Sequence, residues 1–141
     1  MLKGVPRILS PELLKILMEM GHGDEIVIAD ANFPAASNAQ RLVRADGLGA
    51  VEVLEAVMAL FPLDDFVSKP VALMAVVEGD DYAPELWPVY AGIVGRDNPH
   101  FSEFEVIDRF TFYERTRRAY AVVATGEKAR YANIILKKGI L

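Results

Sequence analysis

Short apolar runs dominate the hydrophobic pattern of this 141-residue chain. The run Val71–Val77 and the shorter run Ile26–Ala29 are apolar at every position, which is typical of strands buried on both faces. Shorter or less regular apolar segments occur at residues 104–107, 120–124 and 133–136, and a weak strand pattern occurs at residues 41–46. Together they predict six strands, at residues 26–29, 41–46, 71–77, 104–107, 120–124 and 133–136.

Between these runs the apolar residues recur every three or four positions, which indicates helices. Ser10 and Pro11 have the residue types of an N-cap and a first helical position. Pro88 falls inside a helical stretch, where it is expected to delay or kink the helix. The predicted helices run from Pro11 to Gly21 or Gly23, from Gly49 to Pro62, from Pro84 to about Val94, and from Phe112 to Arg118.

The alternation of strands and helices predicts a layered α/β fold, and the chain length suits one domain, residues 1–141. The two closing strands, 120–124 and 133–136, are separated only by a short loop that contains the turn Thr125–Glu127. An antiparallel pairing of these two strands would make an otherwise parallel sheet mixed.

Composition excludes several classes of function. The net charge of −5 argues against a general nucleic-acid binder, which needs a basic surface. The absence of cysteine excludes disulfides and thiolate catalysis, and with only two histidines a protein-built metal site is not expected. We find neither an apolar run of membrane-spanning length nor a signal peptide, so a cytoplasmic location without membrane attachment is expected.

His22 is the first candidate for chemistry. It lies between Gly21 and Gly23, at the boundary of a predicted helix and a predicted strand. Imidazole both gives and takes a proton near neutral pH, so His22 could serve as a general acid and base. The alternative is a structural histidine that interacts favourably with the dipole at the helix C-terminus.

Asp30 and Arg109 each follow a predicted strand. Because strand carboxyl ends face the ligand crevice in α/β sheets, Asp30 could accept hydrogen bonds from sugar hydroxyls or orient a histidine. Arg109 precedes the aromatic residues Phe110, Phe112 and Tyr113, a mixture suited to sugar binding. The alternatives are a turn-forming Asp30 and a solvated Arg109 beside core aromatics.

Tyr131 and Asn133 stand at the head of the last predicted strand, where their side chains offer hydrogen-bond donors and acceptors. A rim tyrosine and a turn asparagine are the alternative interpretation. The remaining titratable residues suggest no site: His100 resembles a loop histidine, and ordinary surface charge is the interpretation of Glu19, Glu25, Asp64 and Asp65. No motif for nucleotide binding, zinc hydrolysis or a nucleophile elbow occurs.

Five segments together resemble the ribose pyranase and fucose mutarotase family over nearly the whole chain: SPELLKILMEMGHGDEIVIADANFPA, LVRADG, AVVEGD, RFTFYERTRRAYAVVATGE and YANIILKKG. The RADG and FYER portions favour the fucose branch. The resemblance implies a three-layer α/β/α sandwich with a mixed, mostly parallel sheet. It also implies a homo-oligomeric ring, commonly a decamer, with each active site at a subunit boundary.

The activity implied by the resemblance is isomerisation without a cofactor or metal: a mutarotase that interconverts the α and β anomers of a free monosaccharide, L-fucose in this branch. His22 matches the catalytic histidine of the family. Asp30, Arg109, Tyr131, Ala132 and Asn133 match its substrate-binding positions. The alternatives are a D-ribose pyranase that interconverts pyranose and furanose forms, a non-catalytic sugar-binding protein, and a ring-forming structural protein.

Overall fold

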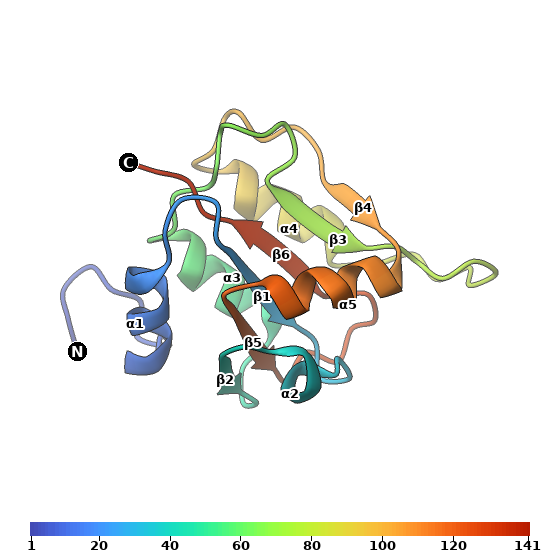
Figure 1. Ribbon diagram of the computed structural model, residues 1–141, viewed down its shortest axis with the longest axis horizontal. Helices are drawn as coiled ribbons and strands as arrows, with labels where there is room; N and C mark the ends of the chain where they lie inside the picture. Colours follow the sequence, from blue (N-terminus) through green and yellow to red (C-terminus); the bar gives the residue numbers. More distant parts are fainter.

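The computed structural model describes residues 1–141 and contains one six-stranded sheet (Figure 1). The strand order is β2-β5-β1-β6-β3-β4. The strands are β1 (Glu25–Ala29), β2 (Leu42–Ala45), β3 (Val71–Met74), β4 (Glu105–Ile107), β5 (Ala121–Thr125) and β6 (Ile134–Lys137). All six predicted strands are therefore confirmed, although β3 ends at Met74 rather than Val77.

Five strands run in one direction, and β6 runs antiparallel between β1 and β3. The mixed, mostly parallel sheet is thus confirmed. The expected pairing of the two closing strands is wrong, because β5 pairs in parallel with β1 and β2 instead. The loop from β5 to β6 crosses over β1, which gains a hydrogen-bonded partner on each side.

Helices cover both faces of the sheet and complete the three-layer α/β/α arrangement. Successive strand residues point to opposite faces, so Ile26 and Ile28 pack on one side, while Val27 and Ala29 pack on the other. The first face is covered by α1 (Pro11–Glu19), α3 (Ala50–Met58) and α4 (Trp87–Gly95), and the second by α2 (Ala35–Asn38) and α5 (Arg109–Arg118). None of these helices has the length and apolar character needed to cross a bilayer.

Two helices begin at other residues than predicted, and one further helix was not expected. Asp108 accepts hydrogen bonds from the N–H groups of Phe110 and Thr111, so α5 begins at Arg109 rather than Phe112. Pro88 lies in the first turn of α4, where its missing N–H costs no helical hydrogen bond, and the helix begins at Trp87. The short helix α2 was not predicted at all.

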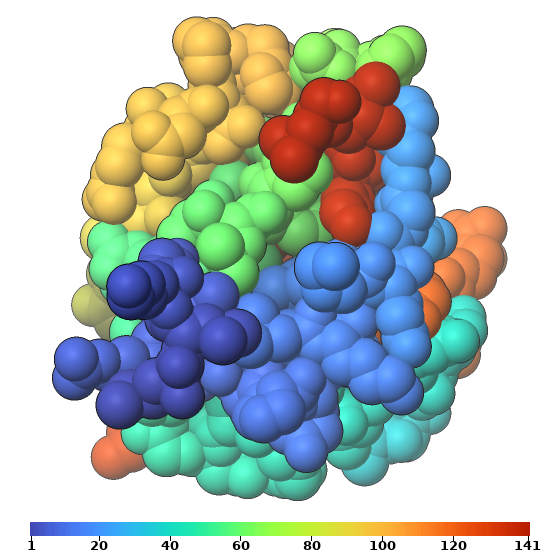
Figure 2. Space-filling view, turned by 90° about the vertical axis from the view of Figure 1, so that its left-hand side faces the viewer, coloured from blue at the N-terminus to red at the C-terminus, as the bar shows by residue number.

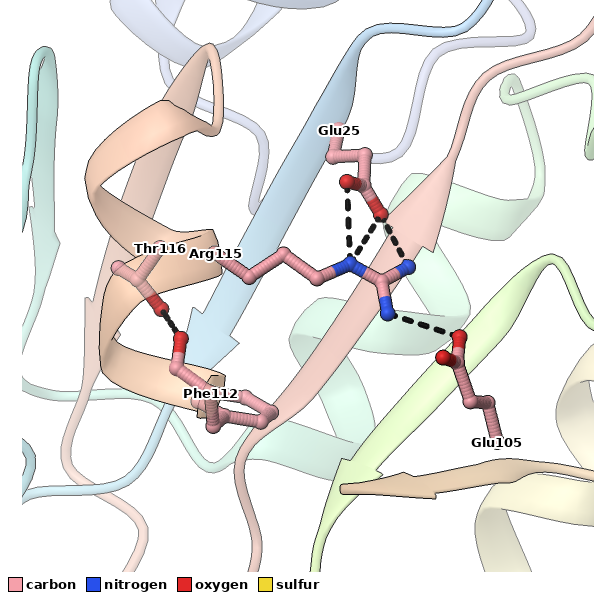
Figure 3. Close-up of polar contacts among 5 residues, drawn as sticks. All are labelled: Glu25, Glu105, Phe112, Arg115 and Thr116. Atoms are coloured by element: carbon pink, nitrogen blue, oxygen red, sulfur yellow. Dashed lines mark hydrogen bonds and ion pairs between the residues drawn. The ribbon is translucent and has the colours of Figure 1, made fainter. Parts of the chain in front are cut away.

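Two opposite edges of the sheet matter for the site. The carboxyl edge is where β1 to β5 end and β6 begins, and the amino edge is where β1 to β5 begin and β6 ends. At the amino edge, Arg115 on α5 reaches across the sheet to Glu25 on β1 (2.6 Å) and Glu105 on β4 (2.8 Å), as Figure 3 shows. The Arg115 side chain is only 14% exposed. Glu25 is therefore a partner in a largely buried ion pair, and its interpretation as surface charge is wrong.

The N-terminal segment, α1 and the C-terminal residues lie together on one face (Figure 2). A mainly apolar hollow of about 380 Å³ lies there, lined in part by Leu14, Met18 and Leu141. None of the residues selected from the sequence lines this hollow, so the chemistry lies elsewhere.

Candidate active site

Asp30 and Asn133 form a reciprocal pair at the carboxyl edge. Asn133 Oδ1 accepts from the Asp30 backbone N–H (2.8 Å), and Asn133 Nδ2 donates to Asp30 Oδ2 (3.0 Å). Both residues are buried, and the Asn32 N–H also donates to Asp30 Oδ1 (3.0 Å). Both hydrogen bonds of the Asn133 amide are made to Asp30, so Asn133 positions the Asp30 carboxylate.

The electrostatics of Asp30 follow from this burial. Loss of water around the carboxyl raises the pKa of Asp30 above its ordinary value, and the hydrogen bonds from the Asn32 N–H and the Asn133 amide offset only part of that rise. A buried carboxylate that can accept further hydrogen bonds is suited to binding hydroxyl groups, because each hydrogen bond from a hydroxyl replaces lost solvation.

A cavity of about 180 Å³ opens in front of this pair. Aromatic rings form part of its wall: Phe33 and Tyr113 pack edge to face, with ring centroids 5.5 Å apart. The full lining is Asp30, Asn32, Phe33, Met74, Tyr113, Arg130, Tyr131 and Asn133. Apolar walls with a few fixed polar groups are the usual composition of a small-molecule site, and here they suit the mixed C–H and hydroxyl surface of a monosaccharide.

Tyr131 lines this cavity and Ala132 does not, and the backbone of both residues is held in place by hydrogen bonds. Tyr131 has a left-handed φ of 57°, which is rare for a residue with a side chain. Its carbonyl accepts from Trp87 Nε1 (2.9 Å), and the carbonyl of Ala132 accepts from the Tyr90 hydroxyl (2.8 Å). Ala132 itself is fully buried and does not line the cavity, so its methyl group acts only in packing.

Arg109 lies at the same edge but outside the Asp30 cavity. Its exposed guanidinium packs over the Phe110 ring, 4.8 Å from the centroid. The two residues line a separate hollow of about 210 Å³ together with residues 75–78 and Asp108. Within one chain, therefore, Arg109 does not join the Asp30 cavity.

His22 lies at the opposite, amino edge of the sheet, beside the end of β6 and before the start of β1. At about 3.3 Å per residue, the four steps along β1 alone carry the chain roughly 13 Å from His22 towards Asp30. The expectation that Asp30 orients this histidine is wrong within one chain. The carboxylate that contacts His22 is Asp64, with its Oδ1 3.1 Å from Nε2.

Asp64 is a candidate site residue that sequence reasoning missed. Its side chain is 3% exposed, whereas that of His22 is 41% exposed. Burial alone would raise the pKa of Asp64, but hydrogen bonds from the Phe66 N–H (3.1 Å) and from His22 outweigh it and hold that pKa below its ordinary value. A buried, ionised carboxylate is therefore the neighbour of the candidate acid and base.

This contact fixes which nitrogen of His22 is available. An ionised carboxylate only accepts hydrogen bonds, so Nε2 carries the proton that it donates to Asp64. Nδ1 is then the unprotonated nitrogen of the neutral ring and is free to take a proton. The Phe66 ring packs against the imidazole, with centroids 4.9 Å apart, and further restricts its orientation.

His100 lies in the same region, with Nε2 3.2 Å from the Asp64 carbonyl oxygen. It touches the backbone of Asp64 rather than the carboxylate, in agreement with its interpretation as a loop histidine. No three His, Asp or Glu side chains come together in an arrangement that could hold a metal ion.

Comparison with known proteins identifies the family. A family model described as the RbsD / FucU transport protein family matches residues 3–141. The chain belongs to this family. An L-fucose mutarotase from Actinobacillus pleuropneumoniae serotype 5b is 49% identical over 99% of this chain and 97% of the relative.

Two crystal structures resemble this family member over its full length. The FucU protein from Bifidobacterium longum superposes with a TM-score of 0.96 at 49% identity, covering 99% of each chain. The fucose mutarotase from Streptococcus pneumoniae in complex with L-fucose superposes with a TM-score of 0.91 at 49% identity, again covering 99% of each chain. The fold predicted from the sequence is confirmed by both.

Proposed function

We propose that this protein is an L-fucose mutarotase, a cytoplasmic isomerase that interconverts the α and β anomers of the free sugar and needs no cofactor. The observation that carries the proposal is the full-length similarity, at 49% identity, to a fucose mutarotase whose structure contains L-fucose. The Asp30 cavity at the carboxyl edge supports it, because its size and its mixture of rings and fixed polar groups suit one monosaccharide.

The ring opens and closes without a redox step, so proton transfer is the only catalytic assistance that the enzyme has to supply. Opening of the hemiacetal ring removes a proton from the anomeric hydroxyl, breaks the bond between the anomeric carbon and the ring oxygen, and adds a proton to that oxygen. Rotation of the resulting aldehyde and reclosure on its other face give the second anomer. A positioned acid or base contributes about 10²–10⁴-fold to such a step.

The residues divide into two roles. His22 exchanges the proton through Nδ1, because Nε2 is occupied by Asp64. Asp30 binds sugar hydroxyls in an orientation fixed by Asn133, and the Tyr131 side chain adds a further polar contact in the cavity.

These two roles lie at opposite edges of one chain, so we propose that the complete site forms between two copies. The amino edge of one copy, with His22, meets the carboxyl edge of the next, with Asp30. Each edge exposes a large aromatic side chain: Phe66 is 69% exposed beside His22, and Phe110 is 68% exposed beside Arg109. Burial of such rings is a typical source of interface stability, and this contact would bring Arg109 and His22 towards the cavity of the neighbouring copy.

A head-to-tail contact of this kind is heterologous and closes into a ring when the rotation between neighbours permits it. We therefore propose a homo-oligomeric ring, with the decamer implied by the family resemblance as the expected assembly. Every boundary in such a ring would hold one active site.

Subunit complementation tests the proposal. His22→Ala and Asp30→Asn proteins are each expected to exchange fucose anomers no faster than buffer, as measured by saturation-transfer NMR. Co-expression in equal amounts should restore activity, because a boundary between an Asp30→Asn copy that supplies His22 and a His22→Ala copy that supplies Asp30 is intact. Random assembly places about one quarter of boundaries in that state, so roughly one quarter of wild-type activity should return.

Two results contradict parts of this proposal. If His22→Ala protein exchanges anomers at the wild-type rate, His22 is not the proton-transfer group. If both single variants are inactive and the mixture stays inactive although mixed oligomers form, the site does not lie between copies. A panel of L-fucose, D-ribose, D-galactose and L-rhamnose tests the sugar: faster pyranose–furanose exchange of D-ribose would indicate a pyranase, and binding without exchange would indicate a sugar-binding protein.

A further inference from the structure

The loop after β3 projects beyond the carboxyl end of that strand (Figure 1). Side-chain contacts link it to Arg130 and Tyr131, shortly before β6. Asp80, in this loop, accepts hydrogen bonds through Oδ2 from the Tyr131 hydroxyl (2.6 Å) and from the Arg130 guanidinium. Its Oδ1 accepts from the Tyr82 N–H (3.0 Å). The Val77 N–H, at the start of the loop, donates a hydrogen bond to the Tyr131 hydroxyl oxygen (3.3 Å).

These contacts determine what the Tyr131 hydroxyl can offer. A phenol has a single proton to donate and lone pairs to accept with. The Asp80 carboxylate takes that proton, since the hydrogen bonds from Tyr131 and the Tyr82 N–H hold the pKa of Asp80 below its ordinary value and keep it ionised. The Val77 N–H occupies one lone pair of the same oxygen, so Tyr131 has its remaining lone pair, and no proton, to offer to a ligand in the cavity.

The ring of Tyr131 is held as firmly as its hydroxyl. The Arg130 guanidinium lies over the rings of Tyr82 and Tyr131, 4.7 and 5.6 Å from their centroids. Trp87 fixes the carbonyl of Tyr131, whose left-handed backbone is the one such conformation outside glycine in the chain. A rare backbone conformation persists when the surroundings over-determine it, and it often accompanies functional geometry.

We propose that Asp80 is a positioning residue that holds Tyr131 as a hydrogen-bond acceptor for the sugar. This inference rests on the proposed function, in which Tyr131 contacts the sugar. Asp80 reaches no ligand itself in this arrangement; it acts through the hydroxyl of Tyr131. A hydroxyl group of the sugar would then be selected for its ability to donate at that position.

A structural role for Asp80, as a simple anchor for the loop, makes a different prediction. An anchor affects the whole loop whether or not Tyr131 has a hydroxyl, whereas a positioning residue has nothing to position once that hydroxyl is removed. A double-mutant cycle between Asp80→Asn and Tyr131→Phe separates the two.

The experiment measures anomer exchange of L-fucose by saturation-transfer NMR in the assembled protein. Asp81→Asn is the matched control, because Asp81 is an exposed neighbour in the same loop and undergoes the same change of charge. We expect Tyr131→Phe and Asp80→Asn each to slow exchange by about tenfold, the loss that corresponds to one charge-assisted hydrogen bond. The double variant should be no slower than Tyr131→Phe, and Asp81→Asn should match the wild type.

Three results would overturn the inference. If Asp80→Asn exchanges as fast as Asp81→Asn, or if it slows Tyr131→Phe by the same factor as it slows the wild type, Asp80 does not act through Tyr131. In both cases the proposed function stands as long as His22→Ala is inactive. If Tyr131→Phe itself exchanges at the wild-type rate, the assignment of Tyr131 within the proposed function is wrong as well. If Asp80→Asn does not fold, Asp80→Glu, which keeps the charge, replaces it in the double-mutant cycle with Tyr131→Phe.

Discussion

Replacement of Asp64 by Asn keeps the size of the side chain next to His22 and removes its charge. The asparagine oxygen still accepts from the Phe66 N–H and from Nε2 of His22, so the geometry is retained. Hydrogen bonds to charged groups contribute about 1.5–3 kcal/mol and those between neutral groups about 0.5–1.5 kcal/mol. The midpoints of these ranges differ by roughly 1.2 kcal/mol, and this is an upper limit because His22 is 41% exposed and water screens its charge.

This difference predicts the kinetic result. The imidazolium that forms when His22 takes a proton loses its anionic neighbour in the Asp64→Asn protein, and exchange of fucose anomers should slow several-fold, by at most about tenfold. The binding constant for the sugar should change little, because Asp64 lies on the side of the ring opposite Nδ1. Saturation-transfer NMR measures the exchange rate and calorimetry the binding constant.

The control is Asp65→Asn, an exposed neighbour with the same change of charge. A ¹⁵N spectrum of His22 gives an independent measurement, and in the wild type it should show the proton on Nε2. The reasoning is refuted if Asp64→Asn and Asp65→Asn exchange anomers at the same rate, or if the wild-type proton lies on Nδ1. Thermal unfolding of each variant establishes that the comparison is between folded proteins.

Further predictions concern stability. Because burial raises the pKa of Asp30 above its ordinary value of 3.8, ionisation of Asp30 disfavours the folded state at pH 7. Asp30→Asn should therefore raise the melting temperature at pH 7, and a calorimetric series should show this advantage shrinking as the pH falls through the raised pKa and absent below 3.8. Arg115→Met leaves Glu25 largely buried without a cation and should cost about 3 kcal/mol in urea unfolding. A Cβ at Gly126 would lie 2.1 Å from a backbone oxygen, so Gly126→Ala should cost roughly 3 kcal/mol by the same assay, whereas Gly47→Ala, where the Cβ meets open space, should be nearly neutral.

The fold was largely predictable because the central strands β1, β3, β5 and β6 are buried on both faces and therefore appear as mainly apolar runs. The neighbour of each strand in the sheet could not be predicted in the same way. A short loop favoured pairing of β5 with β6, yet a loop of eight residues also spans the roughly 10 Å across one intervening strand. That strand is β1, whose two faces and two edges are all covered, and its apolar sequence is equally compatible with either neighbour.

The site was predictable where it depends on the position of a residue along a strand. Asp30 follows an apolar strand, so its place at the carboxyl edge followed from the fold class. Asp64 and its neighbour Asp65 are identical in sequence terms, yet one is buried and the other exposed. What separates them is tertiary: the bridge from Leu63 to Lys138 and the close packing of Gly139 on the Asp64 backbone turn one carboxylate inwards.

The two edges also limit how copies of this protein can cooperate. His22 of one copy must lie against Asp30 of another, and two kinds of contact achieve this. A head-to-tail contact forms one such site per boundary, whereas a twofold contact between antiparallel copies forms two. The proposed activity therefore requires contact between copies for a geometric reason, since β1 separates His22 from Asp30 within each chain.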